Sequence, residues 1–73
     1  MDARHYYQTT PTEQVKAMCE RAGTNIAYFR QIAYGHRRPS PKLARRFHQA
    51  SNGQLELHLL RPDIWLPSEK AAA

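Results

Sequence analysis

Cysteine and long apolar runs are nearly or wholly missing from this sequence of 73 residues. Cys19 is the only cysteine, so no disulfide can form within the chain, and a reducing compartment suits it. No run approaches the roughly 20 apolar residues that a membrane-spanning helix needs. The first residues, "MDARHYYQTT", lack the apolar segment of a signal peptide. These absences predict a cytoplasmic protein with no membrane partner.

Acidic residues are missing from the whole middle of the chain. No Asp or Glu occurs between Glu20 and Glu56. The remaining residues carry four basic and six acidic side chains, a net charge of −2, although the whole chain is +5. Such segregation is typical of a nucleic-acid-binding surface; a basic face without a partner is the alternative. The gap holds seven basic residues: Arg21, Arg30, Arg37, Arg38, Lys42, Arg45 and Arg46.

Residue sets that support catalysis or metal binding are also missing. The sequence shows no paired carboxylates, no Gly-rich phosphate loop and no Ser/His/Asp set that so small a core could organise. The four histidines, His5, His36, His48 and His58, are scattered and accompany a single cysteine, which is not the spacing of a zinc site. We therefore expect no enzymatic activity, no metal, no cofactor and no small-molecule substrate.

Apolar residues recur with helical spacing in three segments. A chain of this length forms one small domain with a modest core, and dimerisation is expected. We predict an all-α domain of five short helices over residues 1–66 and a flexible tail over 67–73. The three expected inner faces are Val15, Met18, Cys19 and Ala22; Phe29, Ile32 and Ala33; and Leu43, Ala44, Phe47 and Ala50.

Capping residues mark the expected helix starts. Thr10 is predicted to cap a helix, with Pro11 in its first turn and Glu13 completing a capping box. Asn25 and the pair Ser40-Pro41 mark the next two starts. The expected helix ends are at Gly23, Gly35 and Asn52-Gly53.

Both ends of the domain are less strongly patterned. Residues 2–9 are expected to form a short helix with Tyr6 or Tyr7 packed inward. Residues 54–60 fit either a strand followed by a turn or one helical turn over 56–60. An internal salt bridge is expected within Arg61-Pro62-Asp63. Leu55, Leu60, Ile64 and Trp65 are expected to cover the core from this side.

Two expected helices are separated by a very short turn. One ends near Ala22 and the next is capped by Asn25, so the helices must cross steeply. Close approach needs a small side chain at Cys19 and a permissive backbone at Gly23. These features specify a helix-turn-helix. About three turns fit between Gly23 and Gly35, enough to lie in a DNA major groove.

The segment "AGTNIAYFRQIAYGHRRPSPKLARRF", residues 22–47, resembles the helix-turn-helix of phage Cro and repressor proteins. With "GHRRPS" at 35–40 and "LRPDIW" at 60–65, the closer likeness is to the YdaS-like small prophage regulators, over roughly residues 12–65. The resemblance implies a Cro-like transcriptional repressor acting as a homodimer at a phage or prophage operator. In one departure, Ile32 and Ala33 stand where the family often has Trp or Leu, which implies lighter packing.

The segment from Asn25 to Tyr34 is the expected recognition helix. Gln31 can pair with adenine, and Arg30 with guanine or a phosphate. Phosphates could be contacted by three kinds of group: the tyrosine hydroxyls, the backbone amides near the start of the preceding helix, and the basic loop. Equal alternatives remain open for two residues: packing in the core for Ile26, and packing on the first helix for Tyr28. Base readout is predicted for Asn25, Ile26, Ala27, Arg30 and Gln31, and DNA-backbone contact for Gln14, Tyr28, Tyr34, His36, Arg37 and Arg38.

Duplex DNA is the expected partner, but two other partners remain open. A dimer would place its recognition helices roughly 34 Å apart on a pseudo-palindromic operator. YdaS-like proteins also resemble antitoxins, which makes a protein toxin the main alternative partner. RNA binding by the basic loop is a third hypothesis, although the recognition helix lacks a clear platform for stacking bases.

Overall fold

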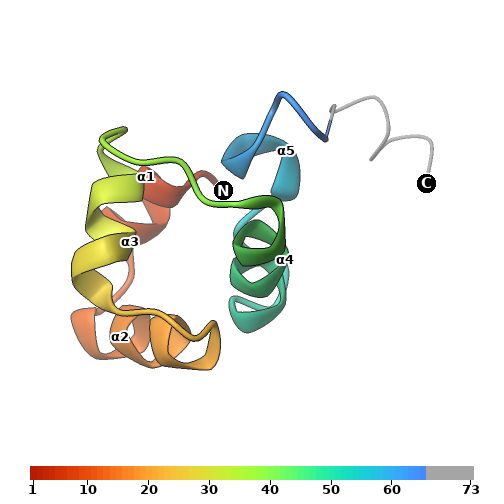
Figure 1. The fold of residues 1–73 in the computed structure, drawn as a ribbon. Coiled ribbons are helices and arrows are strands. Elements are labelled where there is room, and N and C mark those ends of the chain that lie inside the picture. Colours follow the sequence, from red (N-terminus) through yellow and green to blue (C-terminus); the bar gives the residue numbers. More distant parts are fainter. Residues whose placement is uncertain (66–73) are drawn as a thin grey trace.

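The computed structural model describes residues 1–65, and within them the chain forms helices and no strands (Figure 1). The prediction of an all-α fold is therefore confirmed. Leu66 and the predicted tail over 67–73 lie outside the described residues. The five helices are α1 (Ala3–Thr9), α2 (Thr12–Arg21), α3 (Ile26–Ala33), α4 (Pro41–Ala50) and α5 (Leu57–Leu60).

The helices surround a single core. Helix α1 packs against α3, α2 contacts both α3 and α4, and α5 packs against α4. In Figure 1, α2 runs across the direction of α3, and residues 34–40 cross from the end of α3 to the start of α4. Within residues 1–65, no helix covers the outer side of α3.

Two phenylalanines form the centre of the core. Phe29 and Phe47 are fully buried, and their ring centroids lie 5.1 Å apart. Tyr6 meets the Phe29 ring edge-on at 6.0 Å, which joins α1 to α3. The inner faces expected from the sequence are confirmed, with Leu43 half-buried. Cys19 is fully buried, and burial raises the pKa of its thiol to about 11, so it packs as a small apolar residue.

The expected caps hold for two helices and fail for one. Asn25 Oδ1 accepts the Tyr28 backbone N–H at 2.8 Å, and Ser40 Oγ accepts that of Leu43 at 3.1 Å. The prediction for Thr10 is wrong, because α2 is capped by Pro11, which has no side-chain acceptor. The Thr10 N–H instead donates to the Tyr6 carbonyl and ends α1. With only two residues between α1 and α2, Thr10 serves the first helix rather than the second.

The C-terminal segment is helical where the sequence left two interpretations. Residues Leu57–Leu60 form α5, which excludes the strand. Leu55 and Leu60 are buried as expected, but Ile64 is 38% exposed and does not cover the core. Trp65 is half-buried, with its ring centroid 5.7 Å from the Arg45 guanidinium carbon.

Candidate nucleic-acid interface

A four-residue link, 22–25, joins α2 to α3. Gly23 lies in the left-handed region at φ 82°, which strains any residue with a Cβ. A Cβ added there would also come within 3.4 Å of Arg46 Nη1. The Thr24 N–H donates to the Cys19 carbonyl at 2.9 Å and draws the link against α2. Gly23 therefore allows α3 to start close to the end of α2.

The outward face of α3 gathers several of the residues predicted to contact DNA. Phe29, Ile32 and Ala33 are buried in the core, so the opposite side of the helix faces solvent. That side borders a hollow, and its exposed side chains combine hydrogen-bonding and aromatic groups. The hollow is lined by Tyr7, Ala27, Arg30, Gln31, Tyr34 and His36.

Helix α1 adds two residues that the sequence did not assign to this face. The Tyr7 ring lies 5.9 Å from that of Tyr34 and 6.3 Å from that of Phe29. The guanidinium carbon of Arg4 lies 5.3 Å from the centroid of the Tyr34 ring. The only signal in the sequence was the pair Tyr6-Tyr7, of which Tyr6 is the buried member. The position of Tyr34 is therefore set by α1 as well as by α3.

The first turn of α3 has mixed roles. Asn25 Oδ1 accepts one hydrogen bond as the helix cap, and its amide N–H groups are the donors it can offer to another partner. Ile26 and Tyr28 are half-buried and pack against the core. Packing is therefore observed for both side chains, and their contact with DNA stays a prediction.

Arg37 folds back along α3. Its Nε–H donates to Gln31 Oε1, and its guanidinium carbon lies 5.7 Å from the centroid of the Tyr28 ring. The backbone N–H of His36 donates to the Gln31 carbonyl at 2.8 Å, and that of Arg37 donates to the same carbonyl at 3.3 Å. The start of the basic loop is thus attached to the last turn of the helix.

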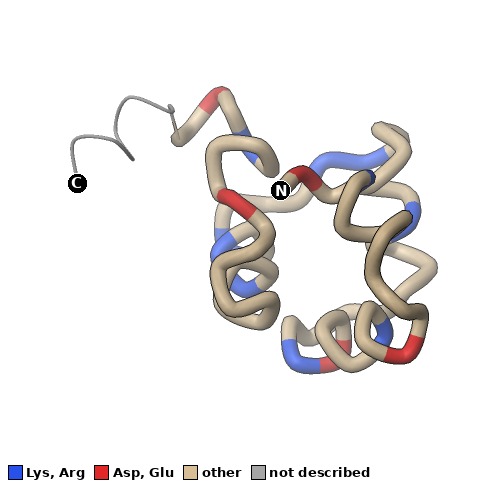
Figure 2. Tube along the Cα trace, turned by 180° about the vertical axis from the view of Figure 1, so that it is seen from behind, with Lys and Arg blue, Asp and Glu red and all other residues tan. Residues whose placement is uncertain are grey.

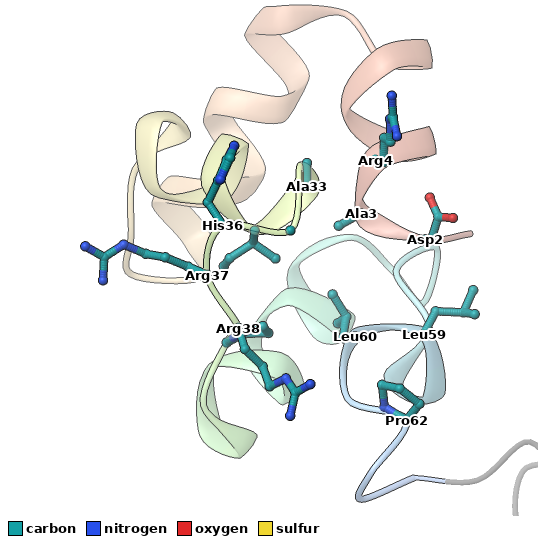
Figure 3. A pocket seen from close by; sticks show the side chains of 13 residues that line it. Asp2, Ala3, Arg4, Ala33, His36, Arg37, Arg38, Leu59, Leu60 and Pro62 are labelled. Carbon is teal, nitrogen blue, oxygen red and sulfur yellow. The ribbon is translucent and has the colours of Figure 1, made fainter.

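Arg38 takes the other direction. In Figure 3, the Arg37 and Arg38 side chains leave the loop in different directions, and Arg37 extends away from the hollow between α1, this loop and α5. Arg38 Nη1 lies 3.8 Å from Asp63 Oδ2. It therefore belongs to a contact with the C-terminal segment and not to the exposed face of α3.

Arg61 holds the two sequence motifs together. It donates Nη1–H to the Pro39 carbonyl at 2.9 Å, 22 residues away in the sequence. It also binds both Asp63 oxygens, at 2.9 and 2.7 Å, which confirms the expected salt bridge. "GHRRPS" and "LRPDIW" are therefore one structural unit that positions the basic loop.

We expect the Asp63→Asn variant to melt at a lower temperature than the parent, in a pH-dependent way. Hydrogen bonds from Arg61 lower the pKa of the Asp63 carboxyl from 3.8 to about 2. A pKa lowered by folding means that the ionised carboxylate stabilises the fold above pH 3.8, and that this contribution is lost as the pH falls through about 2.

Thermal denaturation followed by circular dichroism from neutral pH to about pH 2 checks this. The difference in melting temperature between the parent and Asp63→Asn should become smaller as the pH falls from 3.8 toward about 2. The matched control is Glu13→Gln on α2, at the opposite end of the molecule in Figure 1, which removes one acidic charge without touching this loop. A constant difference at every pH would contradict the role given to the ion pair.

Gln14 lies apart from the group on α3. Its backbone N–H donates to the Pro11 carbonyl at 2.9 Å, so that amide is already engaged. Gln14 borders a different hollow, with Tyr6, Ala17 and the residues that follow α4. The structure thus does not bring Gln14 into the hollow beside Arg30 and Gln31.

The remaining basic residues of the middle segment lie mainly on α4. Figure 2 shows Lys and Arg positions along α4 and in the loop that precedes it. Lys42, Arg45 and Arg46 are exposed. Arg21 instead donates to the Ala50 carbonyl at 2.7 Å and ties α2 to α4. The positive charge therefore extends from the end of α3 along α4.

Three further observations bear on function. Among residues 1–65, no group of three His, Cys, Asp or Glu side chains is placed to hold a metal ion. In the same part of the chain, every helix is too short or too polar to cross a membrane. Comparison with protein-family models, curated proteins and solved structures found no match to this chain.

Proposed function

We propose that this protein is a sequence-specific regulator of transcription that binds duplex DNA as a homodimer. In this proposal α2 and α3 act as a helix-turn-helix, with α3 as the recognition helix. The resemblance to Cro-type and YdaS-like regulators makes repression at a prophage operator the favoured role.

One observation carries the proposal. Helix α3 buries one face in the core and exposes Ala27, Arg30 and Gln31 on the other, and its C-cap residue Tyr34 is also exposed. Arginine and glutamine can each make paired hydrogen bonds to base edges in the major groove, to guanine and adenine respectively. The basic loop follows directly from the end of this helix, and its exposed Arg37 would supply charge for phosphates.

Selection from a pool of randomised duplexes tests the proposal. We expect one palindromic sequence to be enriched, with binding that weakens steeply as salt rises, by a log–log slope of about −0.9 per neutralised phosphate. Sedimentation of the selected complex should show two chains per duplex. A pool with no enriched sequence, or equal competition by single-stranded DNA or RNA, would reject the proposal.

An antitoxin role is the second candidate. The exposed apolar side chains of Leu59 and Ile64, 44% and 38% exposed, lie at the C-terminal end of the described chain and suit a protein contact. Stable co-purification with the product of a neighbouring gene, together with weak and unselective DNA binding, would favour this role over the first.

A further inference from the structure

The contact between Arg37 and Gln31 links the basic loop to the predicted base-reading face. Arginine has five N–H donors, and Nε–H of Arg37 is given to Gln31 Oε1. Its guanidinium also lies beside the Tyr28 ring. Two backbone N–H groups of the loop, those of His36 and Arg37, hold the Gln31 carbonyl. The side-chain and backbone contacts thus converge on one residue of α3.

We infer that Arg37 determines base selectivity by setting the direction of the Gln31 amide; this inference rests on the proposed function. A glutamine side chain carries an acceptor at Oε1 and two donors at Nε2. The bond from Arg37 turns Oε1 toward the loop, so Nε2 faces the other way. Oε1 keeps a second lone pair, so it can still accept a hydrogen from a base.

The direction of the amide matters because A·T and T·A present their donor and acceptor in opposite order across the major groove. A Gln31 amide held in one direction pairs its donor and acceptor with those of one orientation of the base pair. In the reversed orientation it sets donor against donor and acceptor against acceptor. An amide that can flip fits A·T and T·A equally. Arg37 therefore favours one orientation of the base pair that Gln31 reads.

Among the described residues, 1–65, the other side-chain N–H groups of Arg37 donate no hydrogen bond, so they can bind a phosphate. Arg37 is therefore a positioning residue with two roles, one sequence-independent and one acting through Gln31. Arg38 provides a matched comparison, because it has the same charge and the adjacent place in the loop but pairs with Asp63.

The test uses the full chain and a duplex selected from a randomised pool. The base pair read by Gln31 is identified as the one at which Gln31→Ala loses discrimination. Affinities for the selected duplex, and for the duplex with that A·T pair reversed, are then measured for the parent, Arg37→Ala, Arg37→Lys, Arg38→Ala and Gln31→Ala/Arg37→Ala.

We expect Arg37→Ala to reduce the preference at that base pair by about fivefold, the lower end of what one paired contact contributes. Arg37→Lys should keep the salt dependence of the parent but lose most of this preference, because an ammonium lacks the flat guanidinium edge. Arg38→Ala should leave the preference unchanged. In the Gln31→Ala background, loss of Arg37 should change the preference no further.

Two outcomes would overturn the inference. If Arg37→Ala weakens every duplex equally, as a phosphate contact alone would, the inference fails while the proposed function stands. If the parent selects no duplex, both fail. Because Arg37 is exposed, an unchanged melting temperature for its variants will exclude a folding defect as the cause of any change.

Discussion

Phe29→Ala is expected to lower the free energy of unfolding by about 3–5 kcal/mol. Phe29 is fully buried, and its ring meets those of Tyr6, Tyr7 and Phe47, so it joins α1, α3 and α4. Small domains have total stabilities near the lower end of about 5–15 kcal/mol. The variant should therefore be largely unfolded under conditions in which the parent is folded.

Urea denaturation followed by circular dichroism measures this change. The matched control is Ile64→Ala, which also truncates an apolar side chain but at a position that is 38% exposed. It should change stability by no more than about 0.5 kcal/mol. A Phe29→Ala midpoint close to that of the parent would show that the core can close around the missing ring, against the packing described above.

Gln31→Ala is expected to weaken binding to the selected duplex by about 1–3 kcal/mol and to relax selectivity at one base pair. Gln31 is exposed, and its side chain contacts Arg37 but does not support the core. Its loss should therefore leave the melting temperature nearly unchanged. The effect on DNA should fall on one position of the duplex and not on all.

Titration of fluorescent duplexes that differ at single base pairs checks this prediction. Gln49→Ala is the matched control, since Gln49 is also an exposed helical glutamine but lies on α4. It should bind every duplex as the parent does. If instead Gln49→Ala loses selectivity and Gln31→Ala does not, the DNA-binding face is on α4 and the assignment of α3 is wrong.

The inner faces of the helices were predictable because burial imposes a helical period on the sequence. The recurrence of apolar residues from Val15 to Ala22 predicted the buried side of α2, and Phe29, Ile32 and Ala33 did so for α3. Asn25 and Ser40 were predictable as caps because their side chains bond to amides only three residues away. These signals are local, so they can be recognised without knowing the rest of the fold.

Contacts between distant segments were not predictable in the same way. Nothing near Arg4 or Tyr7 indicates that they lie against Tyr34, since that contact depends on how α1 packs on α3. The Thr10 prediction failed for a related reason, because the residue was needed to end the helix before it. The capping preference of a residue does not decide its role where two neighbouring helices could both use that residue.

The sequence by itself determined the helical class, the buried faces, two of the caps and the basic middle of the chain, because each depends on composition or on short, regular spacing. Only the tertiary structure decided the direction of the charged side chains in the loop. Arg37 turns toward Gln31, whereas Arg38 turns toward Asp63 because Arg61 brings the C-terminal segment against Pro39. Two adjacent arginines of the same chemistry differ because their partners come from different parts of the fold.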